Sequence, residues 1–249
     1  MKIGIISDTH LGFGARSERE QDSYFALRQA FEMAGQQKVD FILMPGDLFD
    51  HSIPSQECWH ESFEVFRIPK TFPKSEVKVF KNFGTEKKEA LFDGIPVLAI
   101  HGTHEFRGKG YKNALHVLES AKALIYFHAE AVVVEKNFEK VAIFGLGGVP
   151  EKKALDALQA LNPKPVSGAK NVFVFHQSLK EFLPTDDEMS VTLSLEDLPK
   201  GYVFMKEIIE HKDSTNSYQV VIEGDPTGNR NGPRFYRWLT EDVYKKLKI

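Results

Sequence analysis

The sequence predicts an α/β protein built on a layered, largely parallel sheet. Its short apolar runs have the length and composition of strands that are buried on both faces. Each run leads to aspartate or histidine: 2–7 to Asp8 and His10, 41–44 to Asp47 and Asp50, 96–100 to His101 and His104, 172–175 to His176, and 202–205, more loosely, to His211. Ligands gather beyond the carboxyl ends of such strands, so we expect a metal site at a common edge of the sheet.

The first part of the chain predicts strands at 2–7 and 40–45, each followed by a helix. In the first helix, over 18–37, apolar residues recur at helical spacing and form one buried face, made of Tyr24, Leu27, Phe31 and Ala34. The second helix is expected near 55–66, where Pro54 suits a first turn.

Residues 67–93 have no clean hydrophobic period. They mix charged residues with Pro69, Pro73 and Gly84. We therefore expect a long loop insertion, with a short strand at 77–80 as its one regular element. Loops of this length are usually functional or mobile.

The second part of the chain predicts further strands and helices. The pair Asn162 and Pro163 ends one of these helices. The short strands between 124 and 145 are expected to form a second, antiparallel part of the fold. In chain order the expected elements are strand 95–101, helix 111–122, strands 124–127, 130–136 and 140–145, helix 151–161, strand 171–176, strands 202–209, 217–223 and 233–239, and helix 240–247.

Length and composition predict one domain, over 1–249. The net charge of −3 supplies no overall positive field, so contact with nucleic acid would need a local patch. Cys58 is the single cysteine, which excludes an intrachain disulfide and predicts a buried structural thiol in a reducing compartment. The chain shows no signal peptide and no apolar run near the ~20 residues that span a bilayer, so we expect a cytoplasmic protein.

The residues at the strand ends have the chemistry of a catalytic metal site. Asp8 and His10 are two residues apart, so on an extended strand they lie on the same side and could hold one ion together. The carboxylate of Asp47 has two oxygens and could bridge two ions, while Gly46 and Gly102 let the backbone turn sharply beneath the site. Aspartate and histidine without thiolate suit Mn, Fe or Zn. Two such ions about 3.5–4 Å apart are a common arrangement for phosphoester cleavage.

Taken together, these motifs resemble those of the calcineurin-like metallophosphoesterases. That signature is Asp-x-His, Gly-Asp-x-x-Asp, Gly-Asn-His-Asp/Glu, a lone His and Gly-His-x-His; the matching residues here are Asp8 and His10, Gly46, Asp47 and Asp50, Gly102, His104 and Glu105, and His176. Flanking residues are similar to the SbcD branch, also called the meiotic-recombination-eleven family, which supplies the nuclease of a double-strand-break repair complex. These flanking residues are 7–12, 45–50, 54–55, 176–178 and 198–202.

The resemblance, over about residues 1–212, implies both a fold and a metal site. The fold would be a four-layer α/β/β/α metallophosphoesterase sandwich, and the cofactor Mn²⁺. Asp8 and His10 would bind the first metal, Asp47 would bridge, and His176 would bind the second metal.

The resemblance also implies catalytic and substrate-binding residues. His104 would protonate the leaving oxygen or stabilise the phosphorane, with Asp50 orienting its ring. General acid–base catalysis of this kind is worth about 10²–10⁴ in rate. His51 would touch the substrate or be a rim histidine without a role. The cations expected to meet DNA phosphates, or to form a solvated basic loop, are Arg16, Arg19, Arg107, Lys109 and Lys112.

Two positions depart from the family pattern. Thr103 replaces the asparagine before the motif histidine, and an ungapped alignment of 201–212 puts Ile209 at the first histidine of the closing motif. Both lost residues serve the second metal in the family, so that site would be degenerate and keep Asp47 and His176, with Thr103 as a third ligand. The first site would be complete, with Asp8, His10, Asp47 and His211. In another register, His211 would be a surface residue.

The remaining histidines are expected to have structural roles. His101 is expected to be a satisfied core histidine, although a position behind the metal ligands stays open. His60, His116 and His128 are expected to be structural or exposed.

The expected partner is DNA, and no membrane. Family members commonly dimerise through helices of the nuclease domain, and Trp59, Phe63 and Phe66 would form such a face or lie in the core. The chain ends soon after the phosphoesterase core, so no separate cap or ATPase-binding domain is expected and an SMC-like ATPase partner is doubtful.

Three functions are compatible with these residues. The preferred one is a Mn-dependent DNA nuclease of reduced or altered activity, because Asp50 and His104 are both retained. The second is a pseudonuclease that binds DNA or a partner and holds one structural metal. The third is a metallophosphoesterase that acts on a small phosphoester.

Overall fold

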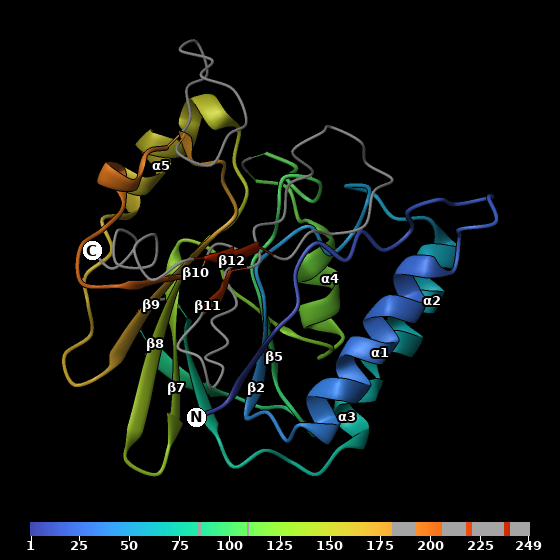
Figure 1. The fold of residues 1–249 in the computed structure, drawn as a ribbon, viewed down its shortest axis with the longest axis horizontal. Helices are drawn as coiled ribbons and strands as arrows, with labels where there is room; N and C mark the ends of the chain where they lie inside the picture. The colour runs from blue at the N-terminus through green and yellow to red at the C-terminus, as the bar shows by residue number, and fades with distance from the viewer. Residues whose placement is uncertain (84–85, 109, 181–192, 206–217, 221–236, 240–249) are drawn as a thin grey trace.

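The fold contains two sheets that face each other. The computed structural model describes residues 1–83, 86–108, 110–180, 193–205, 218–220 and 237–239. The first sheet is parallel and has the order β1-β2-β5-β6, with β1 at Ile3–Ile5, β2 at Phe41–Met44, β5 at Val97–Ala99 and β6 at Ile125–Tyr126. Figure 1 shows this sheet in the middle of the molecule.

The second sheet is mixed and has the order β10-β9-β8-β7-β3-β4. Its strands are β3 (Lys78–Phe83), β4 (Glu86–Ala90), β7 (Glu130–Lys136), β8 (Glu139–Leu146), β9 (Lys170–Phe175) and β10 (Val203–Met205). Strands β8, β9 and β10 run parallel, whereas β8, β7, β3 and β4 are antiparallel neighbours. A separate antiparallel pair joins β11 (Tyr218–Val220) to β12 (Arg237–Leu239).

Helices form the outer layers of the molecule. They are α1 (Asp22–Gln36), α2 (Gln56–Phe66), α3 (Ile68–Thr71), α4 (Ala114–Ser120) and α5 (Ala154–Leu161), with short 3₁₀ turns η1 (Glu151–Lys153) and η3 (Leu195–Asp197). Figure 1 shows α1, α2 and α3 beside the first sheet and α5 beyond the second. The predicted α/β fold with four layers, α/β/β/α, is confirmed.

Apolar clusters fill the spaces between these layers. On β2, Ile42 and Met44 pack toward α1, α2 and α4, while Phe41 and Leu43 pack toward the second sheet. Every β2 side chain is therefore buried, as expected for a strand covered on both faces. The outer face of the second sheet packs Phe173 and other apolar residues against α5.

Side-chain caps set the start of two helices. The hydroxyl of Ser55 accepts a hydrogen bond from the Cys58 N–H at 3.2 Å, so α2 begins one residue later than expected. Asn113 accepts from the His116 N–H at 3.2 Å, which makes α4 shorter than the expected helix at 111–122. Cys58 is buried, as expected for a structural thiol.

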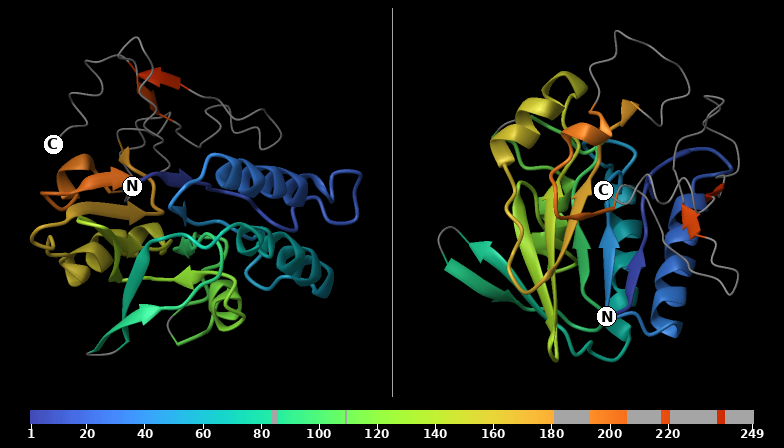
Figure 2. Two further views of the ribbon diagram at one scale, coloured as in Figure 1. Left: turned by 90° about the horizontal axis from the view of Figure 1, so that it is seen from below. Right: turned by 60° about the vertical axis from the view of Figure 1, so that its left-hand side comes forward.

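The expectation of a loop insertion at 67–93 was wrong. The segment forms α3, β3 and β4, and β3 pairs with β7 and extends the second sheet, as the projecting hairpin in Figure 2 shows. Val79 of β3 is fully buried between the sheets. The charge that hid this strand is Lys81, which is itself buried: its ammonium donates to Glu119 Oε1 at 2.8 Å and lies 3.5 Å from Glu130 Oε1.

Two further expectations also needed correction. The strands at 124–145 do not form one antiparallel unit, because β6 joins the first sheet while β7 and β8 belong to the second. The strands that end in candidate ligands do not share one sheet either, since β9 lies in the second. The expected helix at 240–247 and the tail residues 206–209, 221–223 and 233–236 lie outside the described residues.

Within the described part of the chain, no helix is both long enough and apolar enough to cross a membrane.

The buried Lys81 pair predicts a stability effect. Lys81→Ala would leave the Glu119 and Glu130 carboxylates without their shared cation. Both carboxylates keep some solvent contact, so we expect a loss of about 2 kcal/mol in the free energy of unfolding, below the range for fully buried pairs. Urea denaturation would measure it, with Lys78→Ala on the exposed side of β3 as the control. Equal effects of the two substitutions would contradict the importance of the ion pair.

Candidate metal centre

The loops after β1 and β2 run side by side beyond the ends of their strands. Backbone hydrogen bonds join Asp8 N–H to Gly46 C=O at 3.2 Å and His10 N–H to Asp47 C=O at 3.0 Å. Leu11 N–H continues the series to Leu48 C=O at 2.7 Å. This backbone pairing brings the residues predicted from two separate strands to one place.

Three of the candidate ligands have left-handed backbone conformations. The φ angles are 52° at Asp8, 41° at His10 and 47° at Asp47. Non-glycine residues seldom adopt this region, and each such residue costs about 1–3 kcal/mol that its surroundings must offset. Such outliers cluster at functional sites, which supports a functional role for these loops.

Glycines allow the loops to pack closely beneath the ligands. Gly46 has φ 117°, and a Cβ there would lie 2.6 Å from His176 Nδ1. A Cβ at Gly102 would lie 2.0 Å from Asp47 Oδ1 and 2.3 Å from the Asp47 backbone nitrogen. Any larger residue at Gly102 would therefore displace Asp47.

Asp47 is the central group of the site. It is 5% exposed, its Oδ1 accepts from the His104 N–H at 3.0 Å, and its Oδ2 lies 3.3 Å from His176 Nε2. Burial alone would raise the pKa of Asp47, but hydrogen bonding and charge from His176, together with His104, hold it at about 2. The carboxylate is therefore ionised at neutral pH and suited to bind cations.

Two clusters of potential ligands meet at Asp47. The Asp8 cluster contains Asp8, Asp47 and His176, and the His10 cluster contains His10, Asp47 and His104. In each, the potential ligand atoms lie within 4.8 Å of one another. The nitrogen and oxygen donors fit a divalent ion such as Mn²⁺.

The state of His10 also fits a metal ligand. Its Nδ1 is buried and makes no hydrogen bond to any described residue, although Asp50 Oδ1 lies 3.4 Å away. Burial lowers the pKa of His10, against the opposing effect of Asp47 and Asp8. A neutral imidazole with an unused nitrogen is the form that binds metals.

His176 comes from the other sheet, at the end of β9. Its Nδ1–H donates to the Pro45 carbonyl at 3.0 Å, which leaves Nε2 directed at Asp47. A second ring nitrogen held by a carbonyl is typical of metal-binding histidines.

His104 and Asp50 form the predicted pair, partly through the main chain. His104 Nδ1–H donates to the Asp50 backbone carbonyl at 2.7 Å, and the Asp50 carboxylate lies 3.9 Å from the same nitrogen. The other nitrogen, Nε2, lies 3.9 Å from Asp47 Oδ2 on a partly exposed side chain. His104 could therefore exchange a proton with a substrate at Nε2.

Other predicted site residues are less closely involved. Thr103 is exposed on the loop after β5. His51 is exposed, with Nε2 3.6 Å from Asp50 Oδ2. Lys109 and His211 lie outside the described residues, as does Ile209.

The predicted arginines are exposed on loops that follow the site residues. Arg16 has φ 63° in the loop after His10. Arg19 pairs with Asp22 at 2.9 Å. Arg107 donates to the Lys112 carbonyl at 3.3 Å and lies over the Tyr111 ring at 5.7 Å. Arg19 and Arg107 thus contact neighbouring residues of their own loops in the free protein.

Sequence reasoning assigned no role to Glu105. Its side chain is fully buried and accepts from Phe49 N–H at 2.6 Å and Gly102 N–H at 2.7 Å, so it joins the loops after β2 and β5. Burial raises the pKa of Glu105 to about 7, although both N–H donors favour the ionised form. Its place directly after His104, in the acidic position of the motif, was the signal that could have identified it.

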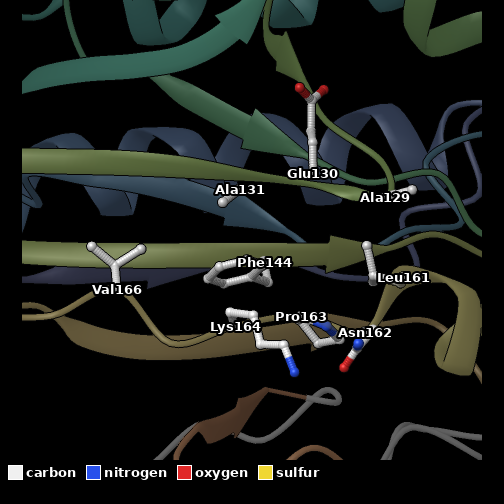
Figure 3. Close-up of a pocket in the computed structure, with 9 residues that line it drawn as sticks. All are labelled: Ala129, Glu130, Ala131, Phe144, Leu161, Asn162, Pro163, Lys164 and Val166. Atoms are coloured by element: carbon white, nitrogen blue, oxygen red, sulfur yellow. The ribbon is translucent and has the colours of Figure 1, made fainter. Parts of the chain in front are cut away.

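A hollow of about 510 Å³ lies elsewhere, on the outer side of the second sheet. Figure 3 shows it between β7, β8 and the segment after α5, with the Glu130 carboxylate pointing away from the other labelled residues. None of the candidate ligands that the structure describes lines it.

The fold and the shared aspartate together define a class of protein. The family described as calcineurin-like phosphoesterase matches residues 1–246, and the chain belongs to this family. The predicted resemblance is thus confirmed.

Among relatives, the chain is similar to double-strand-break repair proteins. It is 30% identical over 208 residues to human "Double-strand break repair protein MRE11", and 30% identical over 205 residues to "DNA double-strand break repair protein Mre11" of Saccharolobus solfataricus. These alignments cover 71% and 81% of this chain but only 29% and 47% of those proteins. The solved structure of TT1561 from Thermus thermophilus aligns with a TM-score of 0.38 and 16% identity, over 78% of this chain and 73% of that one, which is too low a similarity to define the fold.

Glu105 predicts a test of how the two loops are held. Glu105→Gln should leave one of the two N–H donors unsatisfied, because an amide has only one oxygen. We expect a loss of about 1–3 kcal/mol in unfolding free energy and faster hydrogen exchange at Phe49 and Gly102. Urea denaturation and exchange NMR would measure these changes, with the exposed Glu151→Gln as the control. Unchanged exchange at both amides would exclude this role.

Proposed function

We propose that the protein is a metal-dependent phosphodiesterase that cleaves DNA, with Mn²⁺ as its ion. The observation that carries this proposal is the position of Asp47, whose carboxylate belongs to both ligand clusters. A shared carboxylate suits the bridging of two divalent ions in phosphoester cleavage. Support for DNA as the substrate comes from similarity to the human and archaeal repair proteins.

In this proposal the chain's own side chains provide the metal ligands. Asp8, His10, Asp47 and His176 supply ligand atoms, and the further predicted ligands are Thr103 and His211. Bound divalent ions would polarise the phosphoryl group and supply hydroxide as the nucleophile.

His104 would act on the leaving group. The Asp50 carbonyl holds the proton on Nδ1, so Nε2 is the atom that would hold or deliver a proton at the substrate. Asp50 would keep the ring in this orientation. Glu105 would hold the two loops that carry this pair.

We further propose that the activity is reduced or altered. Thr103 replaces an amide with a shorter hydroxyl, and Ile209 offers no ligand atom in the predicted register. Both changes affect the same metal, so one ion would bind well and the other weakly.

DNA would be held by residues around the site. Arg16, Arg107 and Lys109 would meet backbone phosphates, and His51 would approach from beside Asp50. Because Arg107 already contacts its own loop, it would have to release the Lys112 carbonyl to do so. A protein with this substrate would act inside the cell, where DNA is found.

A homodimer remains a proposal that the packing of α2 narrows. Phe66 is buried in the core, while Trp59 and Phe63 are half-buried and stack with ring centres 5.7 Å apart. Of these three residues, only the last two could contribute to a dimer face.

The alternative function is that of a pseudonuclease. Thr103 favours it, because loss of the second metal would leave a DNA-binding or partner-binding protein with one structural ion.

The proposed activity predicts both metal binding and cleavage. Elemental analysis should find bound Mn²⁺, and the protein should cleave single- or double-stranded DNA in a Mn²⁺-dependent manner. Asp47→Asn should abolish cleavage, because the bridging carboxylate is lost. One bound ion without turnover would instead support the pseudonuclease. Cleavage of an aryl phosphodiester but not of DNA would support a small-molecule substrate.

The weak second metal predicts a gain of function. Thr103→Asn combined with Ile209→His should tighten binding of the second Mn²⁺ by about tenfold and raise the cleavage rate, since it restores an amide and an imidazole. Calorimetric titration and DNA cleavage would measure the two effects. Thr103→Val is the matched control and should not tighten binding. If the double variant gains neither occupancy nor rate, the predicted alignment of 201–212 is wrong.

A further inference from the structure

The metal centre draws its ligands from two sheets that share no strand pairing in the described part of the chain. Asp8, Asp47 and His104 follow strands of the first sheet, whereas His176 follows β9 of the second. The sheets face each other through an apolar cluster, which has no directional bonds. Contacts at the site end must therefore set the separation between Asp47 and His176.

One residue makes a two-point link between the sheets at that end. His101 follows β5, and Gly148 lies just after β8. Gly148 N–H donates to the His101 carbonyl at 2.7 Å, and the His101 ring Nε2–H donates to the Gly148 carbonyl at 3.1 Å. Both backbone polar groups of Gly148 are thus bound by His101.

The chain at this link is too closely packed for any residue but glycine. A Cβ at Gly147 would lie 2.4 Å from the His101 ring, and a Cβ at Gly148 would lie 2.4 Å from the Thr103 backbone nitrogen. Gly102, between His101 and Thr103, itself packs against Asp47. The link therefore lies directly behind the shared aspartate.

A buried hydrogen-bond chain fixes the tautomer of His101. The Tyr126 hydroxyl donates to His101 Nδ1 at 2.8 Å and accepts from Asn113 Nδ2 at 3.3 Å. Asn113 cannot turn its amide round, because its oxygen caps α4 by accepting from His116 N–H. Consequently Nδ1 is the acceptor and Nε2 carries the proton that Gly148 needs. His101, Tyr126 and Asn113 are all buried.

The link continues from Gly148 to the metal ligand. His176 N–H donates to the Leu146 carbonyl at 3.1 Å, two residues before Gly148. Leu146 is also the register partner of Phe175, the residue before His176. A shift of the β8 end would therefore move His176 relative to Asp47.

From this geometry we infer that His101 is a positioning residue that sets the separation of Asp47 and His176, and with it the Mn²⁺ affinity of the Asp8 cluster. The inference rests on the proposed function for its metal but not for its substrate. It assigns His101 no contact with DNA or with the reacting atoms.

Two substitutions at His101 separate positioning from bulk packing. His101→Phe keeps an aromatic ring but removes the donor to Gly148, whereas the amide nitrogen of His101→Gln can reach the position of Nε2. We expect His101→Phe to weaken Mn²⁺ binding about tenfold or more, as for other groups that orient metal ligands, and His101→Gln to restore most of it. Calorimetric titration with Mn²⁺ alone would measure both.

Two control variants exclude general effects. Ile143→Val trims the apolar core between the sheets and should lower stability without changing Mn²⁺ affinity. Tyr202→Phe removes a buried hydroxyl that has no hydrogen-bond partner among the described residues, and it should change neither property. Loss of Mn²⁺ affinity in Ile143→Val equal to that in His101→Phe would overturn the inference.

A metal-free measurement tests the inference independently of the function. Proton–nitrogen NMR should show His101 protonated at Nε2, and the His176 ring signals should shift in His101→Phe but return toward wild type in His101→Gln. Unchanged His176 signals in folded His101→Phe would overturn the inference, as would protonation of His101 at Nδ1. Mn²⁺ binding without DNA cleavage would instead reject the proposed function while leaving the positioning role supported by the affinities.

Discussion

The burial of the Asp47 carboxylate is the constraint on which the rest of the site depends. A desolvated negative charge must be compensated, and here His176 and the His104 backbone N–H provide that compensation from two different sheets. To bring those groups within reach, the loops approach so closely that Gly46 and Gly102 cannot be replaced by larger residues. Left-handed backbone at the ligands and the buried bridge of Glu105 follow from the same crowding.

Local patterns in the sequence predicted the strands and the ligands that follow them. A strand such as β2, buried on both faces, is a continuous apolar run, and its end at Asp47 is visible without any tertiary information. The site residues Asp8, His10 and His176 were found in the same way, because each stands where an apolar run stops. The family resemblance then supplied the second sheet and the four layers.

Interactions between distant residues could not be predicted from those patterns. Lys81 made β3 look like a loop, because its partners Glu119 and Glu130 lie far along the chain. Nothing local assigned β9 to the second sheet, since strand pairing depends on tertiary packing. For the same reason the grouping of His10 with His104 became visible only in three dimensions. Glu105 was in the motif, but its two backbone donors belong to different loops.

The position of β4 at one edge of the second sheet has a consequence for behaviour in solution. Its sequence, Glu86–Ala90, places four charged residues along a strand that, within the described part of the chain, pairs on one side only, with β3. An unpaired edge invites another chain to add its own strand, and closely spaced charges oppose such addition. This composition therefore guards a sheet with a long apolar interior against aggregation through that edge.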